Sequence, residues 1–86
     1  MAGDLGSLVG KVVVVSGGTN GLGAATVREC ARQGAAGLVI AGRSRTAGTA
    51  LAADVERAGT PAVYVEADLA DHRAPARIVA AADERF

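Results

Sequence analysis

Three short apolar runs alternate with amphipathic segments along the chain. Residues 12–15 are four consecutive valines, residues 37–41 read Gly-Leu-Val-Ile-Ala, and residues 62–66 read Ala-Val-Tyr-Val-Glu. The first two runs show no polar alternation, which is typical of parallel strands buried on both faces. We therefore expect a parallel strand at each of the three positions.

The segments between these runs have the spacing of helices. Gly34 and Gly59 are suitable stops for the first and second helices, Ser44 or Thr46 can cap the second, and Asp71 can cap the third. The apolar positions expected to face the sheet are Leu22, Val27, Cys30 and Ala31 in the first helix, Ala47, Ala50, Leu51, Val55 and Ala58 in the second, and Ile78, Val79, Ala82 and Phe86 in the third.

This alternation predicts an α/β fold, a Rossmann-type doubly wound parallel sheet truncated to three strands in the order 3-2-1 with three helices. The helices after the first two strands should cover one face of the sheet, and the last helix the other. Residues 1–86 should belong to one domain, with residues 1–7 as a flexible leader.

The amino-acid composition narrows the set of possible partners and cellular locations. The chain is 50% hydrophobic and 2% aromatic and has no formal net charge, which argues against nucleic acid and membrane surfaces as partners. The single cysteine, Cys30, excludes an internal disulfide and fits a reducing compartment. The amino terminus has no basic segment of the kind that opens a signal peptide, and the valine run is too short to span a bilayer. We expect a cytoplasmic protein.

A glycine loop follows the first strand. Gly17, Gly21 and Gly23 have the spacing G-x-x-x-G-x-G. Gly17 is placed to make the turn, and Gly21 and Gly23 would let the N–H groups at a helix start face an anion. The alternative is a merely flexible turn in a glycine-rich chain. The loop predicts a diphosphate site at the carboxyl edge of the sheet.

The other two strand ends carry polar residues. Arg43 lies twenty residues after Gly23, where dinucleotide-binding units place an acid for NAD or an arginine for NADP. Arg43 could therefore bind a 2′-phosphate, with the hydroxyls of Ser44 and Thr19 as further donors. Asp68 could accept from an adenine amino group. The alternatives are a solvated arginine, a helix cap at Ser44 and a turn cap at Asp68.

Neither Cys30 nor the lone histidine, His72, has partners at the spacing of a metal site or a catalytic pair. We read Cys30 as a packing residue and His72 as a surface residue, and we expect no metal.

Three segments resemble the short-chain dehydrogenase/reductase family, and the match runs from about residue 8 to residue 86. The segments are residues 10–23, Ala41-Gly-Arg-Ser44 and Ala67-Asp-Leu-Ala-Asp71. Ser16 and Leu22 replace the usual threonine and isoleucine of that family's glycine loop. The resemblance implies NADP (NADPH) as cofactor and adds contacts to those inferred from the glycines. The expected cofactor-binding residues are Gly17, Thr19, Asn20, Gly21, Leu22, Gly23, Arg43, Ser44, Asp68 and Leu69.

The family's catalytic residues have no counterpart here. The resemblance predicts an Asn-Asn-Ala-Gly segment, a serine and a Tyr-x-x-x-Lys pair, whereas Lys11 is the only lysine and Tyr64, the only tyrosine, is followed four residues on by Asp68. We interpret residues 1–86 as the amino-terminal, NADP(H)-binding part of a single NAD(P)-binding domain, inactive alone. The parent enzyme would transfer hydride between nicotinamide and a carbonyl or secondary alcohol and, by resemblance, assemble as a homo-oligomer.

Other classes fit less well. A methyltransferase would present acids where Ser16 and Arg43 stand, and a P-loop NTPase would have Gly-Lys-Ser/Thr where Gly23 is followed by two alanines. A non-catalytic NADP-binding module and the ketoreductase domain of a polyketide-type synthase remain open. A Tyr-x-x-x-Lys pair downstream in the parent reading frame would exclude the first, and large flanking domains would indicate the second.

Overall fold

The computed structural model describes residues 7–17 and 21–86, and within them the expected strands and helices are present. The elements are β1 (Val12–Ser16), α1 (Gly21–Arg32), β2 (Gly37–Gly42), α2 (Arg45–Arg57), β3 (Ala62–Glu66) and α3 (Ala74–Arg85). The predicted leader falls outside the described residues except for Ser7, whose hydroxyl donates to the Gln33 side chain.

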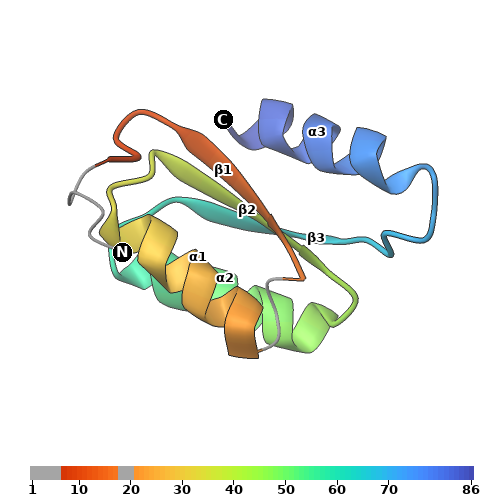
Figure 1. The fold of residues 1–86 in the computed structure, drawn as a ribbon, viewed down its shortest axis with the longest axis horizontal. Coiled ribbons are helices and arrows are strands. Elements are labelled where there is room, and N and C mark those ends of the chain that lie inside the picture. The colour runs from red at the N-terminus through yellow and green to blue at the C-terminus, as the bar shows by residue number, and fades with distance from the viewer. Residues whose placement is uncertain (1–6, 18–20) are drawn as a thin grey trace.

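The strands form one parallel sheet in the order β1-β2-β3, which confirms the predicted order and fold class. In its register Val14 lies opposite Val39, and Ile40 lies opposite Tyr64. Figure 1 shows α1 and α2 side by side on one face of the sheet and α3 on the other. Each strand therefore ends at the same edge of the sheet, where α1, α2 and the turn to α3 begin.

The core lies on both sides of β2, and every residue of that strand is buried. On the side of α1 and α2 the largest buried side chains are Val27, Leu38, Ile40, Leu51 and Val55. On the side of α3 the buried residues are Val39, Ala41, Ala67, Ala74 and Ile78. The run at residues 37–41 was thus correctly predicted as a strand buried on both faces.

The same prediction for β1 was wrong. Val15 is buried toward α1, but Val12 and Val14, which point to the opposite face, are 43% and 48% exposed. The reason is that α3 packs against β3 and β2 and leaves this face of β1 to solvent.

The helix ends and stripes follow the prediction in part. Gly34 and Gly59 have φ of 87° and 113°, as expected of residues that end a helix. Ser44, not Thr46, is the N-cap of α2. Asp71 was predicted to cap the third helix, but α3 begins at Ala74 and its N-cap is Arg73. The Asp71 carboxylate accepts from the Arg73 N–H in the turn that precedes the helix.

The buried stripe of α2 is rotated from the predicted one. Leu51 and Val55 are buried as expected, and Gly48 and Ala52 complete the stripe. Of the other predicted positions, Val27 and Ile78 are buried and Cys30, Ala31 and Ala82 are half-buried. The remaining six are exposed, namely Leu22 in α1, Ala47 and Ala50 in α2, Ala58 directly after α2, Val79 in α3, and Phe86 directly after α3. Alanine gives little information about which side of a helix is buried, and the stripe is fixed by Gly48, which lies against the ring of Tyr64.

Candidate functional site

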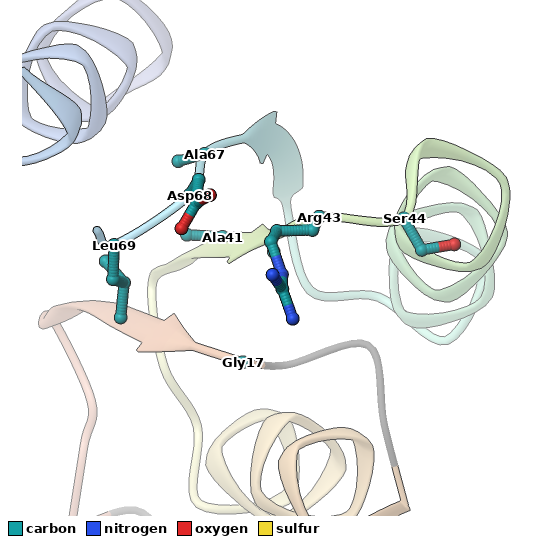
Figure 2. A pocket seen from close by; sticks show the side chains of 8 residues that line it. Gly17, Ala41, Arg43, Ser44, Ala67, Asp68 and Leu69 are labelled. Carbon is teal, nitrogen blue, oxygen red and sulfur yellow. The ribbon is translucent and has the colours of Figure 1, made fainter. Parts of the chain in front are cut away.

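A cleft of about 720 Å³ lies where the three strands end. It is lined by Gly17, Ala41, Gly42, Arg43, Ser44, Ala67, Asp68 and Leu69 (Figure 2). Two backbone hydrogen bonds of 2.8 Å join the strand ends beneath it, from Gly17 N–H to the Ala41 carbonyl and from Ala67 N–H to the Gly42 carbonyl. The cleft is thus built on the carboxyl edge of the sheet, the place where parallel α/β sheets bind ligands.

The first wall of the cleft is the turn that leaves β1. Gly17 has φ of 69°, the left-handed conformation expected for the residue that makes this turn. Thr19 and Asn20 lie outside the described residues. Gly21, Leu22 and Gly23 form the first turn of α1, and the structure does not bring them into the lining of the cleft.

Gly21 is nevertheless the first residue of α1, and its side-chain position is unobstructed among the described residues. A Cβ added to Gly21 would have no described atom within 4 Å, and Leu22 beside it is 82% exposed. The backbone conformation of Gly21 does not require glycine either, since its φ is not positive. A glycine at this position leaves the space of a side chain free beside the helix start, which helps an anionic group to approach the helix N–H groups.

Arg43 supplies the positive charge of the cleft. Figure 2 shows its side chain projecting from the end of β2 toward Gly17. Within residues 7–17 and 21–86, Arg43 is the one arginine with neither a hydrogen bond nor an ion pair. The other arginines bond to carboxylates or, for Arg77, to the Glu66 carbonyl. An exposed guanidinium without a partner is available to an anionic ligand.

Ser44 lines the cleft, but its hydroxyl is used elsewhere. The Ser44 Oγ accepts a 3.3 Å hydrogen bond from Ala47 N–H as the cap of α2, and the side chain points away from Arg43 in Figure 2. The sequence left Ser44 as either a donor to the ligand or a helix cap, and in the structure it caps α2.

Asp68 and Leu69 form the wall contributed by β3. Asp68 Oδ1 accepts a 2.9 Å hydrogen bond from Ala70 N–H, which fixes the turn, and a carboxylate keeps further acceptor sites beyond that one bond. Leu69 is 60% exposed, and both side chains point into the space between the strand ends (Figure 2). This wall combines a hydrogen-bond acceptor with an apolar surface.

A second hollow of about 370 Å³ adjoins the cleft and shares Arg43, Ala67 and Asp68 with it. It adds Glu66, Asp71 and Arg77. Hydrogen bonds from the Arg73 guanidinium and backbone lower the pKa of Asp71 below its ordinary value, so this carboxyl is ionised at neutral pH. The hollow therefore has charges of both signs, as the cleft does through Arg43 and Asp68.

Three lining residues were not predicted from the sequence, namely Ala41, Gly42 and Ala67. They carry no polar side chain, so no motif of functional groups marks them. The available signal was their position at a strand end, within two residues of Arg43 or Asp68, where a small residue lets a ligand approach the backbone.

Other kinds of site lack support in the described part of the chain. It holds no group of three His, Cys, Asp or Glu side chains that could bind a metal ion. No described helix is long and apolar enough to cross a membrane. Burial, reinforced by Glu29, raises the pKa of the Cys30 thiol, as expected for a packing residue rather than a nucleophile.

Comparison with known proteins agrees with the family resemblance found in the sequence. A relative from Azotobacter vinelandii, an L-rhamnose 1-dehydrogenase (NAD(P)(+)), is 42% identical over 84 residues, covering 92% of this chain and 32% of that protein. Among solved structures, a short chain dehydrogenase/reductase from Burkholderia phymatum in complex with NAD has a TM-score of 0.85 at 28% identity, covering 92% of this chain and 28% of that one. A blue fluorescent protein from a metagenomic library in complex with NADPH has a TM-score of 0.83 at 36% identity, covering 91% and 32%.

The chain spans about a third of the length of the curated relatives it matches. A sequence model of the short chain dehydrogenase family matches residues 11–86, which include β1, the glycine loop and the whole cleft lining. The chain belongs to the short-chain dehydrogenase/reductase family, a family of NAD(P)-binding Rossmann-fold oxidoreductases whose members among its relatives include dehydrogenases.

Proposed function

We propose that this chain is the NADP(H)-binding, amino-terminal part of a short-chain oxidoreductase that transfers hydride between nicotinamide and a carbonyl or secondary alcohol. The observation that carries the proposal is the guanidinium of Arg43, which lies in the cleft and has no partner among residues 7–17 and 21–86. The nicotinamide cofactor, when bound, supplies or accepts the hydride.

The residues of the cleft suit the parts of such a cofactor. The start of α1 at Gly21, which follows the turn made by Gly17, offers backbone N–H groups for the diphosphate. Arg43 offers a planar set of donors to a 2′-phosphate. Asp68 and Leu69 offer an acceptor and an apolar surface to adenine. Each assignment uses a group that the fold leaves accessible.

Neither Lys11 nor Tyr64 is placed to donate a proton in the cleft. Lys11 precedes β1, at the end of the sheet opposite the cleft. Tyr64 packs against α2 and donates its hydroxyl to the Gly42 carbonyl, and burial, with Glu66 adding to it, raises the pKa of this phenol. We therefore propose that residues 1–86 bind the cofactor but do not catalyse hydride transfer alone. A cytoplasmic location is part of the proposal and rests on the single cysteine.

The relatives include complexes with NAD and with NADPH, so the test is a titration with both. Arg43→Ala should weaken NADPH binding by roughly one to two orders of magnitude and leave NADH nearly unchanged, since a charge-assisted hydrogen bond contributes about 1.5–3 kcal/mol. Isothermal titration calorimetry measures both affinities.

Arg45→Ala is the matched control. Arg45 lies two residues further on and is held by Glu66 at 2.9 Å, so its loss should not change the ratio of the two affinities. Equal weakening of NADPH and NADH by Arg43→Ala would contradict the role given to Arg43.

A further inference from the structure

The backbone that carries Arg43 is held at one atom, the carbonyl oxygen of Gly42. This oxygen accepts two hydrogen bonds of 2.8 Å, one from Ala67 N–H and one from the hydroxyl of Tyr64. A carbonyl oxygen has two lone pairs, so both are used. Because the Gly42 carbonyl and the Arg43 N–H belong to one planar peptide, the two donors fix the direction in which the chain enters Arg43.

The ring of Tyr64 is itself held by α2. A Cβ placed on Gly48 would overlap the Tyr64 ring, and Gly48 is buried in the second turn of the helix. Its backbone conformation does not require glycine, and glycine inside a helix costs about 1 kcal/mol relative to alanine. The absence of a side chain at Gly48 is therefore explained by the space that the ring occupies.

The hydroxyl of Tyr64 stays a donor at neutral pH. Burial raises the pKa of the phenol above its ordinary value, the carboxylate of Glu66 raises it further, and Arg45 opposes these effects. The phenol therefore keeps its proton at neutral pH and can donate to the Gly42 carbonyl.

We propose that Tyr64 and Gly48 are positioning residues for nucleotide selection: they hold the turn Gly42-Arg43-Ser44 so that the Arg43 guanidinium stays in the cleft, and they thereby strengthen the preference for a 2′-phosphate. This inference rests on the proposed NADP(H) function. Neither residue lines the cleft, so their effect is exerted through the Gly42 carbonyl.

The test uses two small probes that occupy only the adenosine half of the cofactor, adenosine 2′,5′-bisphosphate and adenosine 5′-monophosphate. Calorimetry on the 86-residue chain gives the ratio of their affinities, and thermal unfolding is recorded for every variant.

Tyr64→Phe keeps the ring on Gly48 and removes only the hydroxyl. It should reduce the ratio about three- to tenfold while leaving the monophosphate affinity unchanged. Gly48→Ala, which displaces the ring, should change the ratio in the same direction.

Thr49→Val is the matched control for loss of a hydroxyl. The Thr49 hydroxyl donates to the Arg45 carbonyl inside α2 at 2.7 Å, so its removal should leave the ratio unchanged. An unchanged ratio in Tyr64→Phe, or an equal loss for both probes, would overturn the inference and leave the NADP(H) assignment standing. If the unmodified chain showed no preference for the bisphosphate, the proposed cofactor preference would fail and the inference with it. Should Gly48→Ala not fold, Tyr64→Phe decides alone.

Discussion

β1 and β2 have similar apolar sequences and different surroundings. β2 is buried along its whole length and pairs with a strand on each side. β1, with four valines, pairs only with β2 in the described part of the chain, and Val12 and Val14 are 43% and 48% exposed. An apolar sequence therefore predicts a strand that burial would stabilise. Whether both faces of that strand are buried depends on its position in the sheet.

The largest expected effect comes from the same substitution in each strand. Val14 and Val39 are partners in the register, one exposed and one fully buried. Val39→Ala should lower the free energy of unfolding by about 2 kcal/mol through lost burial and the cavity left behind, and Val14→Ala by no more than about 0.5 kcal/mol. Denaturant unfolding measures both values. Equal losses would show that the exposed face of β1 is covered in solution.

A smaller effect is expected on self-association of the 86-residue chain. An unpaired apolar strand edge is a template for pairing with another chain, so we expect association that depends on concentration. Val14→Lys should weaken it about tenfold, roughly 1.4 kcal/mol, because two like charges would meet at the contact. Sedimentation velocity measures this change.

Val79→Lys is the control for that experiment, since Val79 is 59% exposed on α3 rather than on a strand. It should leave association unchanged. If both lysine variants associated as the unmodified chain does, β1 would not be the contact surface.

The smallest expected effect concerns an ion pair between the two helix layers that cover β2. Glu56 of α2 and Arg85 of α3 form a 2.7 Å ion pair that joins the helices on opposite faces of the sheet. Both side chains are 43% exposed, so Glu56→Gln should destabilise the fold by less than about 1 kcal/mol, and less again at high salt. Glu84→Gln, which removes a carboxylate without an ion pair in the described structure, is the control. Thermal unfolding of both variants at several salt concentrations measures the loss of stability. If the two variants lost the same stability, the ion pair would not be a stabilising contact.

Much of the fold was predictable because the local signals agree with the global arrangement. The bounds of β3, the stops at Gly34 and Gly59 and the strand order all follow from run lengths, glycines and the handedness of crossovers. Burial was predicted less well, because it depends on contacts between distant segments. The rotation of the α2 stripe toward Gly48 depends on Tyr64, sixteen residues further along the chain.

The candidate site shows the same limit. The sequence pointed to Gly17, Arg43 and Asp68 because each combines a special residue type with a strand end, and the structure brings all three to one cleft. It could not tell whether Ser44 would cap α2, or that Arg43 would have no partner in the described part of the chain, since the second outcome depends on which carboxylates the fold brings near each arginine.

The hydrogen bonds from Gly17 to Ala41 and from Ala67 to Gly42 have a consequence for the entropy of binding. They continue the pairing of the strands by one step into the loops that line the cleft. These loop residues are therefore ordered when the chain folds, rather than when a nucleotide arrives. A ligand that meets a preorganised backbone loses less of its binding free energy to ordering the protein. In the nucleotide complex that we propose, the sheet would thus contribute to affinity through rigidity, in addition to placing the residues that line the cleft.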